Sequence, residues 1–245
     1  MFGISYLIQN PTLVDVSWVL NHKIIALGLA SKNFTSFQSI LKPTRLILLS
    51  LTTIWAIRLG GFIFYYRIWN NHIDPRYKEI SKKNTLNDTV FSFLQFQIQG
   101  ILSTITAIPL FYALKNSSRK LNSFNKLAIC FAVIGLIGEG IADNQLQKFK
   151  ENRKDNTELF REGFFKNARH PNLFFELVFW TSIAAFGFNI KNPYSLFAFT
   201  GPMFLWAIMY YITIPITTNH LMKTKPDYDK VISETNIFYP FKHSK

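Results

Sequence analysis

The stretch ARHPNLFFE brings several chemically useful side chains together in a short space. Arg169 is a permanent cation, His170 an imidazole and Asn172 an amide, and they stand directly before an apolar run that contains one carboxylate, Glu176. Arginine binds phosphates with paired hydrogen bonds, and asparagine suits hydroxyl and amide partners. The pattern is either a helix entry at Pro171 that happens to be polar, or a pocket at a membrane surface.

A second group of candidates occurs in GLIGEGIADNQLQKF. Glu139 and Asp143 are four residues apart and therefore share one face of a helix. Gln145 and Lys148 follow them. The carboxylates and the amide suit ribose hydroxyls and amides, and the lysine adds a cation for a phosphate.

Further candidates lie in the first third of the chain. HIDPRYKE contains Arg76 and Tyr77, and two apolar runs contain Asp15 and Arg58. Ionisable residues within membrane spans are costly and usually face a bundle interior or a watery cavity. Arg58 has an equally good structural interpretation, as a lock that pairs with Asp15 or Glu139.

The elements that must position these residues are membrane helices. The sequence is 49% hydrophobic with 25 phenylalanines, and long runs carry no charge at all. About 20 apolar residues cross a bilayer as a helix, which satisfies its own backbone hydrogen bonds. Six spans are predicted, at about Thr12–Ala30, Leu46–Tyr66, within Thr89–Leu114, about Leu127–Ala142, about Leu173–Ile190 and within Pro193–Thr217.

These runs predict an all-α fold, a polytopic membrane helix bundle of about six transmembrane helices, with seven as the upper estimate. The whole of residues 1–245 is expected to form one domain, with a tail at 218–245. The last apolar run is long enough to tilt, or to break near Gly201-Pro202.

The distribution of basic residues predicts the orientation. Seventeen lysines and arginines fall on the side that holds both termini, and eight fall on the other side. Basic loops stay on the cytoplasmic side, so both termini are expected in the cytosol or, in an organelle, the matrix. Three candidate segments, HIDPRYKE, DNQLQKF and NARHPN, fall on this basic side and can line one vestibule.

Several other chemistries are disfavoured. The net charge of +13 could indicate nucleic acid, but basic loops beside membrane spans are better explained by anionic lipid headgroups. Cys130 is alone, so no disulfide framework or cysteine metal site is expected, and no metal-ligand spacing occurs. Phosphate-binding glycine loops and serine nucleophile elbows are also missing from the sequence.

The order of motifs resembles the steroid 5-alpha-reductase superfamily, and in particular its branch of small polytopic proteins. The resemblance covers nearly the whole chain and is most specific in the last motif. It rests on VDVSW (Asp15, Trp18), WAIRLGGF (Trp55, Arg58), DPRY (Asp74, Arg76, Tyr77), Gln99-Gly100 and Pro109, GEGIADNQLQKF (Glu139, Asp143, Gln145, Phe149) and ARHPNLFFE.

The resemblance implies an NADPH-dependent reductase that acts on an activated carbon–carbon double bond in a lipid such as a steroid enone. It implies that NADPH is held on the cytosolic side by Arg76, Tyr77, Asp143, Gln145, Arg169, His170 and Asn172, with Arg58 and Glu176 supporting the pocket and Lys148 nearby. Asp15, Glu139 and Tyr77 are the candidates for the acid that polarises the substrate carbonyl.

Three departures from the family pattern support an alternative. Leu173 replaces a tyrosine, Phe175 replaces a glycine, and Thr218 stands where a glutamate is usual. A benzyl group at Phe175 could clash with a ligand, because glycine beside a cofactor usually permits close backbone approach. The chain is then either a reductase of altered specificity, or a non-catalytic subunit of a larger membrane complex.

A minor alternative is an isoprenylcysteine-type methyltransferase using S-adenosylmethionine, which shares a similar Arg-His-Pro motif.

The expected location is the endoplasmic reticulum or the mitochondrial inner membrane. Expected partners are membrane lipids, a lipid or steroid-like substrate if the protein is active, and subunits of a larger complex if it is not.

Overall fold

The computed structural model describes residues 1–32, 42–81, 84–116 and 121–241. Within these ranges the chain is almost entirely helical, and the only β pairing is an isolated bridge between Ala168 and Asn236. Several of the basic residues counted for topology lie outside the described residues. The predicted all-α membrane bundle is confirmed.

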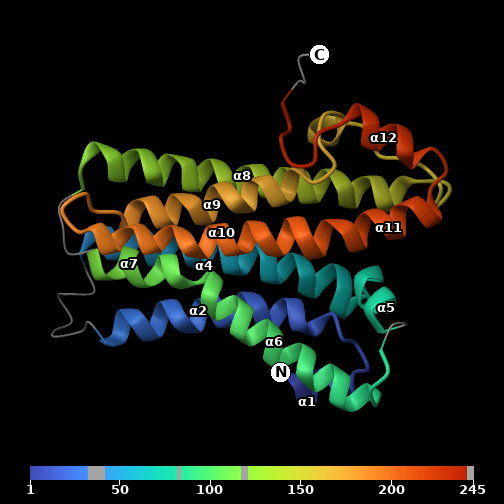
Figure 1. Ribbon diagram of the computed structural model, residues 1–245, viewed down its shortest axis with the longest axis horizontal. Helices are drawn as coiled ribbons and strands as arrows, with labels where there is room; N and C mark the ends of the chain where they lie inside the picture. The colour runs from blue at the N-terminus through green and yellow to red at the C-terminus, as the bar shows by residue number, and fades with distance from the viewer. Residues whose placement is uncertain (33–41, 82–83, 117–120, 242–245) are drawn as a thin grey trace.

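Long helices lie side by side, and the short helices α5 and α12 lie toward the end drawn on the right (Figure 1). The α-helices are α1 (Phe2–Leu7), α2 (Leu13–Lys32), α4 (Pro43–Ile63), α5 (Pro75–Ser81), α6 (Asp88–Thr106), α7 (Ile108–Asn116), α8 (Ser123–Asn152), α9 (Pro171–Gly187), α10 (Thr200–Ile208), α11 (Ile214–Thr224) and α12 (Tyr228–Glu234). The π-helical segments are η1 (Phe64–Trp69) and η4 (Met209–Thr213), and the 3-10 segments are η2 (Gly163–Lys166) and η3 (Pro193–Phe199).

Five segments of the described chain are long and apolar enough to cross a membrane. They are Leu13–Ser31, Pro43–Trp69, Asp88–Lys115, Ser123–Asn152 and Pro193–Thr224. The predicted span at Leu173–Ile190 corresponds to α9, which has only 17 residues. At 1.5 Å per residue it extends roughly 26 Å, slightly less than a hydrocarbon core of roughly 30 Å.

Helix starts follow local sequence signals. Pro43 and Pro171 occupy the first helical positions of α4 and α9, where their lack of an N–H costs nothing. The side chain of Asn122 accepts a hydrogen bond from the Asn125 backbone in a reciprocal capping box that begins α8. The last apolar run does not break at Gly201-Pro202: the 3-10 segment η3 ends at Phe199 and continues directly into α10 at Thr200.

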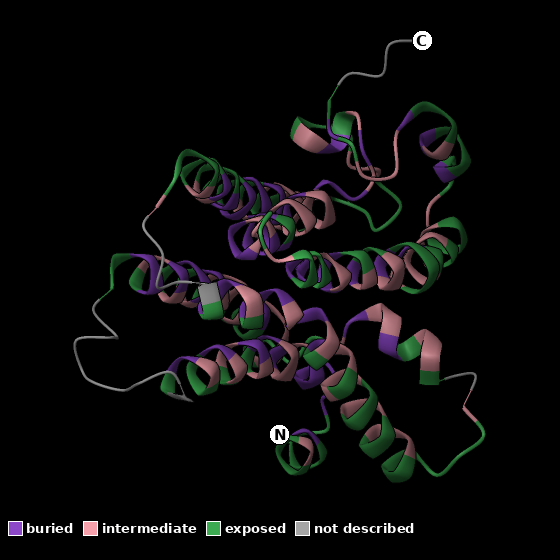
Figure 2. Ribbon diagram, turned by 60° about the vertical axis from the view of Figure 1, so that its left-hand side comes forward, coloured by how far each residue is buried: buried purple, intermediate pink, exposed green. Residues whose placement is uncertain are grey.

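The core consists of apolar faces that meet between the helices, and the outer faces remain exposed and largely apolar (Figure 2). Trp55, Phe179 and Trp180 are fully buried at its centre, with the Trp55 and Trp180 rings 4.9 Å apart in an edge-on arrangement. An exposed apolar exterior is expected where lipid replaces water as the solvent.

Helices α8 and α9 approach each other very closely. A Cβ placed at Gly135 would lie 2.7 Å from the backbone nitrogen of Phe179, and a Cβ at Gly138 would overlap the ring of Phe175. Glycine therefore permits this contact, as small residues commonly do between membrane helices. The pair fixes the position of α9, whose first turn follows Arg169 and His170.

Candidate functional site

The candidate segments meet at one end of the bundle. The start of α2, the helix α5, the last turns of α8 and the segment leading into α9 lie toward the right in Figure 1. This arrangement agrees with the expectation that DPRY, DNQLQKF and NARHPN occupy the same side.

The first cluster is an arginine–aspartate network formed by Asp15, Arg67, Asp74, Arg76 and Tyr77. Asp15 receives Arg67 at 2.8 Å, Arg76 at 3.0 Å and the Tyr77 hydroxyl at 2.5 Å. Asp74 receives Arg67 at 2.9 Å and Arg76 Nε at 3.0 Å. Two carboxylates and two guanidinium groups are thereby neutralised against each other.

The electrostatics of the network fix its protonation state. Burial opposes the ionisation of Asp74, but the charges of Arg76 and Arg67 outweigh it and hold the pKa of this carboxyl well below its usual range. Burial, followed by the negative charge of Asp15, raises the pKa of Tyr77 well above its usual value. Asp74 is therefore an anion and Tyr77 a neutral phenol at physiological pH.

The second cluster, the Arg58 cluster, consists of Arg58, Glu139, Asp143 and Asn172. Arg58 Nη2 contacts the Glu139 carboxylate, and Arg58 Nη1 lies 2.8 Å from Asp143 Oδ2. The other oxygen of Asp143 accepts a hydrogen bond from Asn172 Nδ2 at 3.1 Å. Of the two structural pairings predicted for Arg58, the one with Glu139 forms, and Asp15 instead joins the first network.

Glu176 lies between these two groups of charges. Arg58 and Asp143 act on its carboxylate from one group, and Asp15 and Arg76 act on it from the other. Its side chain is half-buried, and it forms no hydrogen bond with any residue in the described part of the chain. Glu176 is therefore the one candidate carboxylate here that has no direct partner within that part.

Gln145 has a structural partner of its own. Its side-chain oxygen accepts a hydrogen bond from the backbone N–H of Phe164 at 3.1 Å. The preceding residue, Gly163, has φ of +54°, and a Cβ there would overlap the Gln145 amide. A glycine is required at this position for both reasons. Gln145 thus holds the segment that leads to Arg169. Lys148 is exposed and forms no hydrogen bond or ion pair with the described residues.

Arg169 and His170 lie where the chain enters α9, against the C-terminal segment. Their backbone N–H groups donate to the carbonyls of Asn236 and Ile237, each at 2.9 Å. Arg169 Nη1 contacts the Ile232 carbonyl at 3.4 Å, and no carboxylate within the described residues pairs with it. Arg169 Nε and His170 Nε2 are both buried without a hydrogen-bond partner.

His170 is neutral in this position. Burial, and then the adjacent charge of Arg169, lowers the pKa of its imidazole to about 4. Only 8% of the residue is exposed. A buried nitrogen without a partner is uncommon and calls for an explanation, and a bound ligand is one such explanation.

The residues that depart from the family pattern lie in different surroundings. Phe175 is buried between α8 and α9, with its ring against Gly138 and 5.0 Å from the ring of Phe164. Leu173 packs against the core, and Thr218 is half-buried on α11. The clash predicted here is between a ligand and the Phe175 ring. In the fold this ring is already packed between α8 and α9.

Arg67 was the main participant that sequence reasoning missed. It was counted only among the loop cations, although it binds both Asp15 and Asp74. Its position directly after an apolar run, seven residues before Asp74, was the signal that could have identified it.

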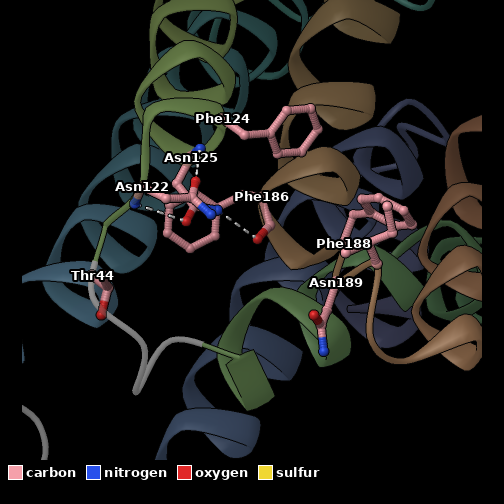
Figure 3. A pocket seen from close by; sticks show the side chains of 8 residues that line it. Thr44, Asn122, Phe124, Asn125, Phe186, Phe188 and Asn189 are labelled. Carbon is pink, nitrogen blue, oxygen red and sulfur yellow. Dashed lines mark hydrogen bonds between the residues drawn. The ribbon is translucent and has the colours of Figure 1, made fainter.

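A separate hollow lies at the opposite end of the bundle, where α8 begins and α9 ends (Figure 3). Its volume is about 280 Å³, and it is lined by Thr44, Asn122, Phe124, Asn125, Phe186, Phe188, Asn189 and Ile190. Within it, Asn125 Nδ2 donates to the Phe186 carbonyl at 3.3 Å. None of the predicted site residues lines this hollow.

The fold and its apolar helices define an integral membrane protein of the all-helical, polytopic class. Residues 1–235 match the family described as "Protein of unknown function (DUF1295)", and the chain belongs to that family. No curated protein and no solved structure matches the chain. The family match spans every candidate site residue.

Proposed function

We propose that this protein is a membrane reductase that binds NADPH at its basic end and reduces an activated carbon–carbon double bond in a lipid. The observation that carries the proposal is the pair Arg169 and His170, which keeps buried nitrogen atoms without partners at the start of α9. The resemblance to the steroid 5-alpha-reductase superfamily agrees with this, since the pair falls in the most specific shared motif.

The chemistry of the donor groups fits a phosphate-bearing cofactor. Arg169 offers a guanidinium that no described carboxylate neutralises, and the exposed Lys148 adds a second cation. Asn172 and Gln145 are amides, but both already bind within the protein, to Asp143 and Phe164. We therefore assign the phosphate end of NADPH to Arg169, His170 and Lys148.

NADPH, when bound, would supply the hydride for the double bond. The protein's own contribution would be to polarise the substrate carbonyl and to hold charge near it. Tyr77 is suited to the first role, because its raised pKa keeps the phenolic proton in place at neutral pH. In the fold this hydroxyl donates its proton to Asp15 Oδ1, while Arg67 and Arg76 contact the other carboxylate oxygen. To polarise the carbonyl, the hydroxyl would therefore have to turn from Asp15 to the substrate.

Glu139 is less suited than Tyr77 to act as the acid, because Arg58 contacts its carboxylate directly. Glu176 has no such partner and faces both clusters, so it would support the pocket electrostatically. We place the reductase in the endoplasmic reticulum or the mitochondrial inner membrane, with both termini on the cytosolic or matrix side.

A second candidate function is a non-catalytic subunit of a larger membrane complex. Its support is the extent of internal pairing: Arg58, Arg67 and Arg76 are all neutralised by carboxylates, and Phe175 fills an interface between helices. Such a scaffold can be stable without a ligand.

The test is an NADPH titration of the detergent-purified full chain, followed by cofactor fluorescence. We expect wild-type protein to bind with a Kd on the order of micromolar and Arg169→Ala to weaken binding about tenfold or more, because a charged hydrogen bond contributes about 1.5–3 kcal/mol. Arg161→Ala is the matched control, because Arg161 precedes the same helix but pairs with Glu234 at the surface.

A folded wild-type protein that leaves NADPH unbound would overturn the reductase proposal. Migration within a large assembly in mild detergent would then support the second candidate. S-adenosylmethionine is titrated in parallel, and selective binding of that ligand would instead favour the methyltransferase.

A further inference from the structure

Lys23 lies near the middle of the membrane-crossing helix α2. The helix extends from Leu13 to Lys32, so Lys23 is roughly 14 Å along the axis from the Lys32 end at 1.5 Å per residue. A charged side chain at such a depth is costly and normally faces the bundle interior or an opposite charge.

The contacts of Lys23 satisfy it only in part. Its ammonium donates to the Thr53 hydroxyl at 2.5 Å and to the Leu49 carbonyl at 3.4 Å, both on α4. An ammonium has three donors, so one is left over. No aspartate or glutamate contacts it within the described ranges, in contrast to Arg58, Arg67 and Arg76.

Lys23 lies at the seam between α2 and α4 and is partly open to the outside of the bundle. The residue is half-buried, and both helices carry apolar side chains with large exposed fractions near it in sequence. On α2 they include Ile24 at 65% and Leu27 at 51%, and on α4 they include Ile54 at 55% and Ile57 at 70%. We call this surface the Lys23 face.

A lipid headgroup is a poor partner at this depth. Thr53, which binds the ammonium, is ten residues into the span that begins at Pro43, or roughly 15 Å along its axis. Half of a hydrocarbon core is about 15 Å thick, so phosphates lie well beyond the ammonium. An acidic side chain on a neighbouring helix can reach it at the same depth.

We propose that the Lys23 face binds a membrane helix of a partner protein, and that this helix places one aspartate or glutamate against Lys23. The apolar residues around it would pack against the partner, and the carboxylate would accept the remaining ammonium donor. This inference does not depend on the reductase proposal, because the Lys23 face contains none of the site residues.

The test uses model transmembrane peptides reconstituted with the full-length protein in phosphatidylcholine bilayers. Each peptide is a leucine-rich helix with a central Glu, Gln or Leu and a fluorescent acceptor at one end. The donor dye is attached to a cysteine introduced at Ser31, at the exposed end of α2, in a Cys130→Ala background. Energy transfer is measured against the peptide-to-lipid ratio.

We expect the Glu peptide to reach half-saturation at a ratio on the order of tenfold lower than the Gln peptide, as an interhelical polar contact contributes about 1–2 kcal/mol in model peptides. Lys23→Leu should abolish this preference and Lys23→Arg should retain it. Lys126→Leu is the control, because Lys126 is an exposed lysine at the start of α8. Thermal unfolding in detergent checks that each variant is folded.

Equal binding of the Glu and Gln peptides would overturn the proposal, as would a preference that survives Lys23→Leu. Energy transfer between donor- and acceptor-labelled copies of the protein, lost on Lys23→Leu, would also overturn it, because the occupant would then be a second copy rather than a different protein.

Discussion

The arginine–aspartate network and the segment around Arg169 lie at the same end of the bundle, but they differ in whether carboxylates neutralise their arginines. Arg67 and Arg76 each contact both Asp15 and Asp74. Within the described residues, the hydrogen bond of the Arg169 side chain goes to the carbonyl of Ile232, and its Nε is buried without a partner.

The difference distinguishes guanidinium groups that are paired within the fold from one that is free to bind a ligand. Removing one partner of a buried, paired guanidinium is strongly destabilising, and such a guanidinium has to break existing contacts before it can bind a ligand. An unpaired one contributes little to stability and can bind an anion directly. Mutations in the network should therefore act on folding, and mutations at Arg169 should act on binding.

The largest effect is expected for Asp74→Ala. Removing this carboxylate leaves Arg67 and Arg76 to share Asp15, and breaking a buried ion pair costs about 3–5 kcal/mol. The thermal midpoint of the detergent-purified protein should fall well below that of wild type. Arg169→Ala serves as the comparison and should leave the midpoint nearly unchanged. Equal losses in the two variants would remove the distinction between the regions.

The next largest effect concerns pH. The pKa of His170 is about 4 in the fold, against about 6.5 for an unperturbed imidazole, so the unfolded chain binds more protons between these values. The contribution of neutral His170 to the free energy of unfolding is fully present above pH 6.5 and is lost as pH falls toward 4. The loss is at most about 3 kcal/mol. Thermal midpoints of wild type and His170→Asn, measured from pH 7.5 to 4.5, should converge on acidification. Parallel curves would mean that His170 is not buried as a neutral group.

A smaller effect is expected for Gly138→Ala, which tests how the start of α9 is positioned. The added methyl group would overlap the Phe175 ring, and overpacking of this kind costs about 1–3 kcal/mol. Phe175→Leu in the same chain should restore part of the lost stability, as followed by thermal unfolding. A double variant no better than Gly138→Ala alone would show that the ring is not what limits the approach of the helices.

The smallest effect is expected for Glu234→Gln. This change removes the surface pair with Arg161, which joins the segment before α9 to α12. Both side chains are well exposed, and such pairs contribute at most about 1 kcal/mol. Added salt should reduce the already small difference from wild type in thermal midpoint. A loss as large as that of Asp74→Ala would mean that the stability contributed by an ion pair at this end does not depend on its burial.

The sequence by itself determined the class of fold. Uncharged apolar runs long enough to cross a bilayer leave only helices as a solution, and five of the six predicted spans meet that length in the described chain. Local signals such as Pro171 at the start of α9 also marked helix boundaries, because they act through the backbone of adjacent residues.

The gathering of the candidate residues at one end could be predicted as well. Helices that cross alternately return their loops to the same side, so the positions of the spans determine which loops meet. The pairing of Glu139 and Asp143 on one face of α8 likewise follows from helical periodicity, and both contact Arg58.

Only the tertiary structure decided which charge neutralises which. Arg58 pairs with Glu139 and Asp143, Asp15 pairs with Arg67 and Arg76, and Arg169 is left without a carboxylate in the described chain. These choices depend on how each helix is rotated about its axis and how closely its neighbours approach, as Gly138 permits for Phe175. Rotation and approach result from the packing of all the helices together, so residue types and spacing along one segment do not determine them.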